Sequence, residues 1–156
     1  MIEQLNWEGA GHYLLWLAGW REARGEGFQG MLGVMCCFRN RIERPSWWGE
    51  DYYSVVTKRW QVSSITDPSD KQLTKFPAHG DASAETAMQI AIEVINRTVE
   101  HPATGADSYF DTSILNTPRK PSWATPERFV KQIGRLLFYN VDMDHELEII
   151  EKKVWP

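Results

Sequence analysis

Two apolar segments joined by a short turn constrain the fold more than any other feature of this sequence. Residues 12–18 form an apolar run with the length of a short buried helix, and Gly25 stands where the residue after a helix end is expected. From about Phe28 to Ile42, apolar side chains recur at spacings of three and four residues, as one face of a second helix requires. Gly30 and Gly33 on this segment would let a neighbouring helix approach closely. The pattern predicts two adjoining helices with a tight turn between them.

Further elements follow in an order that indicates one mainly helical domain. The 156 residues, 42% hydrophobic and 24% charged, have the size and composition of a single globular domain over residues 1–156. The predicted fold class is α+β, predominantly α, with a small β element. A loosely attached lead-in is predicted at 1–11, a short helix at 51–58 and a core helix capped by Asp81 or Ser83. A β element is predicted around Tyr109, and a last helix at 142–153. Between them, a helix should start at Thr125-Pro126 and place Phe129, Ile133, Leu136 and Leu137 on its inward face.

The charge pattern and the start of the chain bear on partners and location. The net charge is −4, and the 17 Lys and Arg residues are scattered without a basic stripe, so we expect no nucleic-acid partner. The apolar stretch at 13–20 is too short to span a membrane, so we expect no membrane insertion. No signal peptide is visible at Met1-Ile2-Glu3-Gln4, which favours a protein that stays in the cytoplasm after synthesis. We expect a monomer.

Several kinds of catalytic chemistry fit this sequence poorly. The four histidines are far apart and no H-E-x-x-H stretch is present, which argues against a zinc peptidase or amidase. Cys36 and Cys37 are neighbours in an apolar helical segment, so we expect buried free thiols and neither a disulfide nor a nucleophile. No phosphate-binding loop or dinucleotide fingerprint is present. We therefore expect no metal and no cofactor.

Glu22 is the first candidate for a catalytic residue. It falls in the last turn of the first predicted helix, where the negative end of the helix dipole disfavours a charged carboxylate by about 0.3–1 kcal/mol. Trp20 and an apolar segment flank it, so its carboxyl group should keep a proton more easily, as a general acid must. The alternative is a structural ion pair of Glu22 or Glu26 with Arg21 or Arg24.

The stretch Glu22-Ala23-Arg24-Gly25-Glu26, followed by Gly30, Val34 and Asn40-Arg41, resembles the opening block of the cell wall hydrolase family of spore-cortex-lytic enzymes and related phage endolysins. The resemblance continues in pieces from about residue 16 to 139. It implies a lysozyme-like domain of two lobes with a cleft between them. It also implies cleavage of peptidoglycan glycan strands between N-acetylmuramic acid and N-acetylglucosamine, with Glu22 as general acid and base.

The same resemblance implies a set of residues around the substrate. Gln61 and Ser63 fall in a family Gln-Phe-Ser motif, Thr104 and Tyr109 in a segment that reaches the cleft, and Trp123 in a Pro-x-Trp motif. For Gln61 and Tyr109 a purely structural role is the alternative. The chain departs from the family pattern at His101, where Asp is usual, and at Met31 and Leu136, where the family has Gln and His.

Two reactions and one binding role remain open. Lysozyme-like enzymes with a single glutamate usually act as lytic transglycosylases, which the family resemblance favours here. If Glu26, Asp107 or Asp111 holds a water molecule or stabilises an oxocarbenium ion, the protein is a hydrolytic muramidase instead. The third possibility is a catalytically inactive glycan-binding or virion protein. The missing export signal fits a phage endolysin that waits in the host cytoplasm until a holin opens the membrane.

Overall fold

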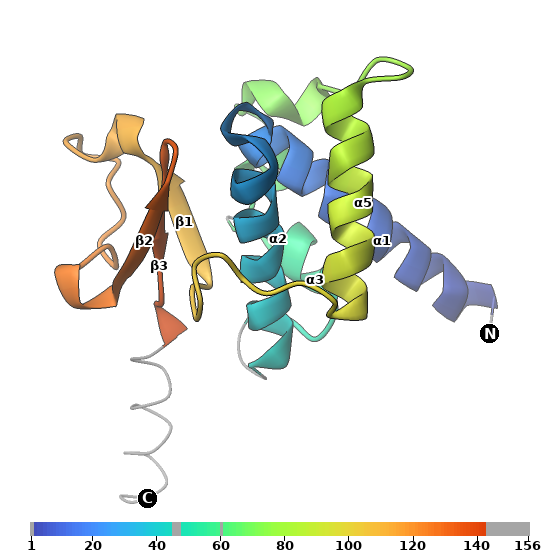
Figure 1. Ribbon diagram of the computed structural model, residues 1–156, viewed down its shortest axis with the longest axis horizontal. Coiled ribbons are helices and arrows are strands. Elements are labelled where there is room, and N and C mark those ends of the chain that lie inside the picture. The colour runs from blue at the N-terminus through green and yellow to red at the C-terminus, as the bar shows by residue number, and fades with distance from the viewer. Residues whose placement is uncertain (1, 45–47, 60, 143–156) are drawn as a thin grey trace, which may run out of the picture.

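The computed structural model describes residues 2–44, 48–59 and 61–142, and of residues 2–7 the backbone alone. A helical part stands beside a small sheet (Figure 1), so the predicted α+β class with mostly helices is confirmed. The longer elements are α1 (Ile2–Ala23), α2 (Gly27–Glu43), α3 (Tyr52–Thr57), α4 (Ser63–Thr66), α5 (Ala82–Asn96), β1 (Ser108–Asp111), β2 (Phe129–Ile133) and β3 (Leu136–Tyr139). Short 3-10 helices lie at η1 (Arg24–Glu26), η2 (Lys71–Thr74), η3 (Thr112–Ile114) and η4 (Pro126–Arg128). Within these ranges, no helix has both the length and the apolar character needed to cross a membrane.

Helix α2 is the central layer of the molecule. It packs against α1 and α5 on one side and against strand β1 on the other (Figure 1). Its residues from Gly30 to Arg39 are all buried, and the thiols of Cys36 and Cys37 are free, as predicted. Close approach of α1 depends on Gly19, because a Cβ there would lie 2.4 Å from Cε of Met35. The apolar periodicity of this segment thus predicted the core correctly.

The sheet has three antiparallel strands in the order β1-β3-β2. Its central strand β3 is buried on both faces: Leu136 and Phe138 join the main core, whereas Leu137 and Tyr139 pack with Phe110 in a second apolar cluster. Gly33 of α2 receives the ring of Phe138, since a Cβ on Gly33 would lie 2.7 Å from it. The close neighbour expected at this glycine is therefore a strand and not a helix.

A buried carboxylate connects the sheet to the C-terminal end of α2. Asp107 has no exposed surface, and it accepts hydrogen bonds from Nη1 of Arg44 at 2.7 Å and from the backbone N–H groups of Val141 and Asp142 at 2.9 and 3.0 Å. The Nε of Arg41 donates to the carbonyl oxygen of Asp107 at 2.7 Å. The fold therefore depends on Asp107, because its removal would leave Arg44 and two backbone N–H groups without their carboxylate acceptor.

Three sequence-based expectations need correction or qualification. The lead-in at 1–11 is helical from Ile2, and Gly11 lets the backbone of Tyr53 approach α1, since a Cβ there would lie 3.0 Å from its nitrogen. The helix expected after Thr125 is a single 3-10 turn and then the β2–β3 hairpin, because Gly134 adopts a positive φ of 56° that forms a turn. The helix expected at 142–153 lies outside the described residues, apart from Asp142.

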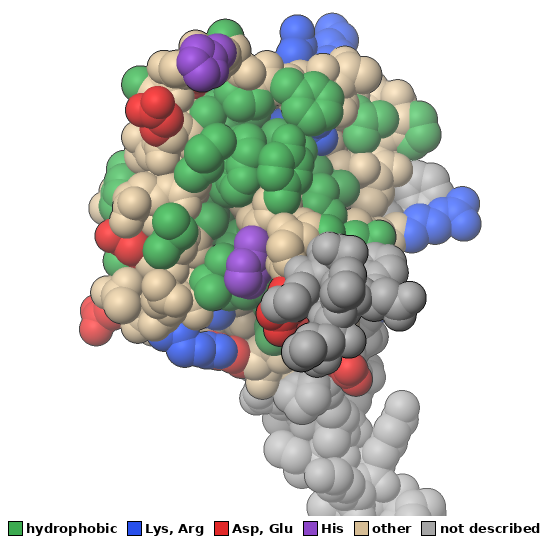
Figure 2. Space-filling view, turned by 90° about the vertical axis from the view of Figure 1, so that its right-hand side faces the viewer, with side chains coloured by type: hydrophobic (Ala, Val, Ile, Leu, Met, Phe, Trp, Pro, Cys, Tyr) green, Lys and Arg blue, Asp and Glu red, His purple; other side chains and the backbone are tan. Residues whose placement is uncertain are grey.

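Hydrophobic side chains gather on the face of the molecule that lies away from the sheet (Figure 2). The large exposed apolar residues include Tyr13 of α1 and Met88 and Ile92 of α5. Helix α5 is capped as predicted, with Asp81 accepting a hydrogen bond from the backbone N–H of Ala84 at 3.0 Å. The polar hollows of the molecule lie elsewhere, on either side of α2.

Candidate active site

A cavity of about 630 Å³, here termed the Glu22 cavity, is walled by the helical part on one side and the sheet with its loop on the other. Its walls come from the C-terminal end of α1, from α2, from the segment 61–72 and from β1 with the loop that follows it. Residues far apart in the sequence thus place a carboxyl group, hydroxyls, amides and aromatic rings around one hollow. The lining side chains include Arg21, Glu22, Arg41, Gln61, Ser63, Gln72, Tyr109, Asp111, Arg119, Trp123 and Leu136.

Glu22 lies in the last turn of α1, as predicted, and borders the cavity with a partly exposed side chain. Burial raises the pKa of Glu22 above its usual range, and the negative charge of Asp70 acts in the same direction. Hydrogen bonds from Ser64 and the positive charge of Arg41 oppose the rise in pKa without cancelling it. A carboxyl group whose pKa is raised beside an open cavity has a property that a general acid requires.

The ion pair considered as an alternative for Glu22 is not formed with any described residue. Arg21 donates to two backbone carbonyl oxygens, those of Ser64 at 3.0 Å and Lys75 at 2.9 Å. Arg24 lies over the ring of Trp20, with its guanidinium carbon 4.2 Å from the ring centroid. Both arginines are therefore occupied elsewhere, and the carboxyl group of Glu22 faces the cavity without a cation bound to it.

Ser64 positions the carboxyl group of Glu22. Its hydroxyl donates to Oε1 of Glu22 at 3.0 Å, and its backbone N–H approaches the same oxygen at 3.5 Å. Arg21, through its bond to the carbonyl oxygen of Ser64, holds this short helix against α1. The sequence pointed to Ser63 and not to Ser64. Within the single turn of α4 the side chain of Ser64 is buried and that of Ser63 is exposed, and this difference is visible only in the structure.

Tyr109 reaches the same cavity from strand β1. Its ring packs against Phe38 and Phe138, with ring centroids 6.2 and 6.1 Å apart. Burial raises the pKa of Tyr109 well above its usual range, and the nearby charge of Glu22 adds to the rise. The phenol group therefore stays protonated at neutral pH and is available as a hydrogen-bond donor in the cavity.

The other residues singled out from the sequence divide into two groups. Gln61, Ser63 and Trp123 line the Glu22 cavity together with Glu22 and Tyr109, and Trp123 packs edge-on against the ring of Phe110 with centroids 5.9 Å apart. Thr104 lines a different cavity on the other side of α2. Of the substrate-binding residues predicted from the sequence, all but Thr104 therefore line the same cavity as Glu22.

Glu26 also lies away from the Glu22 cavity. Its carboxylate faces the turn between β2 and β3, where Oε2 accepts a hydrogen bond from the backbone N–H of Arg135 at 3.4 Å. A Cβ on Gly134 would lie 2.5 Å from the same oxygen, and a Cβ on Gly30 would lie 2.4 Å from the Cβ of Glu26. Glu26 thus lies between Gly30 and Gly134, and its side chain connects the β2–β3 hairpin to the start of α2.

Asp111 is the second carboxylate that lines the Glu22 cavity. Burial raises the pKa of Asp111, but hydrogen bonds from Ser113 and the charge of Arg135 outweigh it, so the net pKa is lowered. Asp111 is therefore ionised at neutral pH. Asp107, the other carboxylate considered from the sequence, has no exposed surface and is bound to Arg44 and backbone N–H groups. Asp111 alone of the proposed water-holding residues borders the cavity.

The departures from the family pattern have clear structural places. Leu136, where the family has His, lies on β3, is 3% exposed and lines the Glu22 cavity with an apolar side chain. Met31, where the family has Gln, is 2% exposed in the main core. Only the first of these changes alters the surface of the cavity.

Comparisons with known proteins agree with this architecture. Residues 25–139 match the family model described as Cell Wall Hydrolase, a match that begins just after Glu22. The structure is similar to the catalytic domain of the germination-specific lytic transglycosylase SleB from Bacillus anthracis, with 22% sequence identity and a TM-score of 0.62. The likeness covers 83% of this chain and 93% of that one and, at this identity, shows a shared fold. A comparison with curated proteins finds no match. Because the family match spans well over half of its residues, the chain belongs to the cell wall hydrolase family.

Proposed function

We propose that this protein cleaves the glycan strands of peptidoglycan between N-acetylmuramic acid and N-acetylglucosamine, with Glu22 as the general acid and base. One observation carries the proposal: in a cell wall hydrolase fold, a glutamic acid with a raised pKa borders a cavity of about 630 Å³. A cavity of this size is in the range of ligand-binding clefts. Its mixture of aromatic rings, hydroxyls and amides suits sugar rings and their N-acetyl groups.

In the reaction we favour, a lytic transglycosylation, Glu22 acts twice. Its protonated carboxyl group first donates a proton to the glycosidic oxygen as the bond from this oxygen to C1 of the muramoyl residue breaks. The resulting carboxylate then accepts the proton of the muramoyl 6-hydroxyl while O6 bonds to C1 and closes a 1,6-anhydro ring. Glu22 ends the cycle protonated, and no water is consumed.

The surrounding residues have roles that follow from their positions. Ser64 holds the carboxyl group of Glu22 through Oε1, which leaves the other oxygen, Oε2, for the proton transfer. The protonated phenol of Tyr109 donates a hydrogen bond toward the departing sugar oxygen or Glu22 itself. Trp123 and Gln61 bind the sugar ring and an N-acetyl group on the cavity walls.

Hydrolysis is the second candidate reaction, and Asp111 is the observation that favours it. Two carboxyl groups in one cavity, Glu22 with a raised pKa and Asp111 with a lowered one, form the kind of pair that glycoside hydrolases use. In this reaction Asp111 holds a water molecule or stabilises the oxocarbenium ion, and the product has a reducing end. A non-catalytic glycan-binding role is the third candidate, supported only by Leu136 at the position of the family His.

Digestion of purified peptidoglycan by the wild type and by Glu22→Gln, read by mass spectrometry, separates these candidates. Anhydro-muramoyl ends that disappear in the variant establish a transglycosylase with Glu22 as its acid. Reducing muramic ends that disappear in Glu22→Gln and in Asp111→Asn establish a muramidase. A wild type that binds the polymer but releases nothing leaves the binding role.

The role as a phage endolysin stays a prediction. It is tested by expressing the chain in bacteria with and without a holin that opens the cytoplasmic membrane. Lysis that requires the holin and an intact Glu22 supports it. Lysis by the chain alone contradicts it, because the protein would then reach the wall without help.

A further inference from the structure

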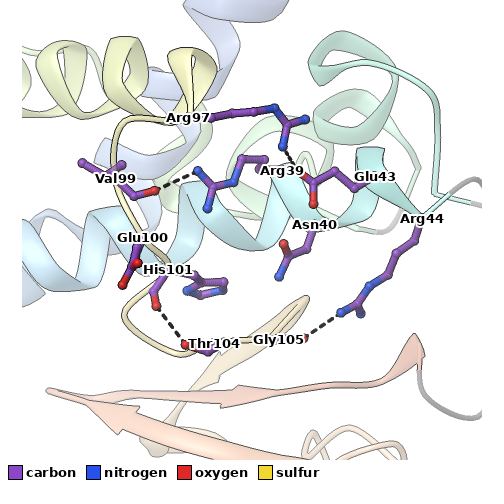
Figure 3. Close-up of a pocket in the computed structure, with 10 residues that line it drawn as sticks. All are labelled: Arg39, Asn40, Glu43, Arg44, Arg97, Val99, Glu100, His101, Thr104 and Gly105. Atoms are coloured by element: carbon purple, nitrogen blue, oxygen red, sulfur yellow. Dashed lines mark hydrogen bonds and ion pairs between the residues drawn. The ribbon is translucent and has the colours of Figure 1, made fainter.

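A second cavity, of about 470 Å³, lies on the other side of the C-terminal end of α2 from the Glu22 cavity. We term it the Arg39 cavity. Figure 3 shows its walls: the end of α2 on one side and the connection between α5 and β1 on the other. Its lining is polar and mostly charged, and the proposed cleavage reaction uses none of it. The residues that matter below are Arg39, Glu43, Arg97, Glu100, His101 and Thr104.

Arg39 is the unusual member of this cavity, because its charge has no counterpart. The side chain is nine-tenths buried, and among the described residues no carboxylate lies within ion-pair distance of it. Its Nη1 donates to the carbonyl oxygen of Val99 at 3.1 Å, while its buried Nε has no hydrogen-bond partner. In Figure 3 the guanidinium group lies on the side of the cavity formed by Val99, Glu100 and His101. A buried guanidinium group with one N–H left without an acceptor is stabilised by an anion placed beside it.

The remaining charges of the cavity are already paired or exposed. Arg97 pairs with Glu43 across the rim, and Arg44 is bound to Asp107 and to the carbonyl oxygen of Gly105. His101 carries no charge at neutral pH, because burial lowers its pKa to about 4. The buried part of the cavity therefore has a net charge of one positive unit, which belongs to Arg39. A group with one negative charge neutralises it, whereas a doubly charged phosphate would meet the carboxylates of Glu43 and Glu100 at the rim.

We propose that the Arg39 cavity is a binding site for a carboxylate group, held by the guanidinium of Arg39 and reached past Thr104. If the protein cleaves peptidoglycan as proposed above, the carboxylate is that of a peptide stem attached to the glycan strand. The site then holds the peptide of the polymer on one side of α2 while the glycan occupies the Glu22 cavity on the other. Thr104 thus contacts substrate, as its motif implied, but in a place separate from the sugar.

Binding is tested first with a small monocarboxylate, N-acetyl-D-alanyl-D-alanine, against its C-terminal amide. The full chain is titrated with each, and backbone amide shifts are followed by NMR. We expect saturable shifts at Val99, Thr104 and Gly105 with the acid, and at least about tenfold weaker binding of the amide, since a hydrogen-bonded charge is lost. Arg39→Gln should weaken acid binding by about tenfold, and Arg97→Gln, whose arginine is paired, by less than about threefold.

Arg39 is buried, so its replacement can disturb the fold. Thr104→Trp is the second variant, because Thr104 is exposed and lines the cavity, so a large side chain there should take up part of its volume. It should abolish the acid-induced shifts while the rest of the spectrum stays that of the wild type. Equal binding of acid and amide, shifts confined to Tyr109 and Asp111, or inorganic phosphate binding more tightly than the acid would each overturn the proposal.

The link to the wall polymer is tested on two substrates, peptidoglycan with its peptide stems and the same glycan after the stems are removed. We expect the wild type to show a KM about tenfold lower on the substrate with stems and an unchanged kcat, and Thr104→Trp to lose this preference. A wild type that cleaves both equally well contradicts the peptide as ligand but leaves the cleavage proposal standing. Absent cleavage of both contradicts the function and leaves the NMR result intact.

Discussion

Glu22 and Arg39, which line the two cavities on either side of α2, respond to burial in opposite ways. The carboxyl group of Glu22 has a pKa that burial raises, and Ser64 is its hydrogen-bond partner. The guanidinium group of Arg39 cannot become neutral and has one backbone acceptor. Burial thus favours the neutral form of Glu22, whereas in our proposal it leaves Arg39 able to bind an anion. Mutations at these two residues and at their neighbours can separate the two responses.

Glu22→Gln should lower kcat by about 10²–10⁴-fold, the usual contribution of a general acid and base. It should also stabilise the fold at neutral pH. Because the pKa of Glu22 is raised on folding, the folded state holds a proton that the unfolded state releases, and stability falls as pH rises above the unfolded pKa. Muropeptide release and urea unfolding at pH 7 measure both effects. The exposed Glu85→Gln is the matched control, and an unchanged kcat would contradict the role of Glu22.

Asp107→Ala should destabilise the protein by about 3–5 kcal/mol, because it removes the carboxylate closest to Arg44 and leaves two buried backbone N–H groups without their acceptor. Asp107 precedes β1 and holds the wall between the two cavities, so both should lose their shape together. The measurement is the free energy of unfolding in urea, with the exposed Glu85→Gln as the control. A loss below about 1 kcal/mol would show that Asp107 does not hold this wall.

Acidification should weaken the Arg39 side of the molecule through His101. Its pKa is lowered by burial from 6.5 to about 4, so the unfolded state binds a proton that the folded state resists between these values. Stability should therefore fall by up to about 3 kcal/mol as pH falls through this window. Glu22 contributes with the opposite sign. Urea unfolding from pH 4 to 7 gives the free energy of unfolding as a function of pH. This dependence should be flatter for His101→Gln than for the wild type, and an identical dependence would show that His101 does not cause it.

Ser64→Ala should lower kcat by about tenfold and move the alkaline limb of the pH–rate profile to higher pH. The hydroxyl of Ser64 donates to Glu22 and lowers its pKa, so its loss raises the pKa of the acid further and weakens its positioning. Ser64→Thr should restore both the rate and the limb. Ser63→Ala is the matched control, which should leave the limb in place. A limb that moves to lower pH, or not at all, contradicts the role of Ser64.

Glu43→Gln should change the free energy of unfolding by less than about 1 kcal/mol, because its ion pair with Arg97 is largely exposed. The same change frees Arg97 as a second cation at the rim of the Arg39 cavity. Titration with inorganic phosphate, followed by NMR, should then show tighter binding than in the wild type. Unchanged phosphate binding would mean that the rim carboxylate does not select for a single negative charge.

The sequence predicted the parts of this structure that depend on local pattern. Helical periodicity located α2 and α5, and the position of Glu22 in the last turn of α1 followed from Gly25 and the apolar run before it. The hairpin at 129–139 was missed, because Phe129, Ile133, Leu136 and Leu137 have a spacing that suits a helix as well as two strands. Only pairing with β1, a contact distant in sequence, decides between them.

The candidate site was predictable to the extent that motifs carried it. Gln61, Ser63, Tyr109 and Trp123 were singled out by resemblance, and all four line the same cavity as Glu22. Ser64 could not be told from its neighbour, since the direction of a side chain in a single helical turn is a property of the fold. Thr104 was expected in the same cavity as Tyr109 but lines the cavity on the other side of α2. A sequence motif gives the order of residues along the chain, and it does not determine which cavity each side chain lines.

The contact of Gly33 with Phe138 has a consequence for how such an enzyme changes over evolutionary time. The sheet rests on α2 through this contact, while the outer wall of the Glu22 cavity belongs to the long loop between β1 and β2. Substitutions in that loop can alter which wall polymer is accepted without shifting the sheet. A side chain at position 33 would move every residue of β1 relative to the acid at once. We therefore expect specificity to change through substitutions in the loop, and glycine to be retained at position 33.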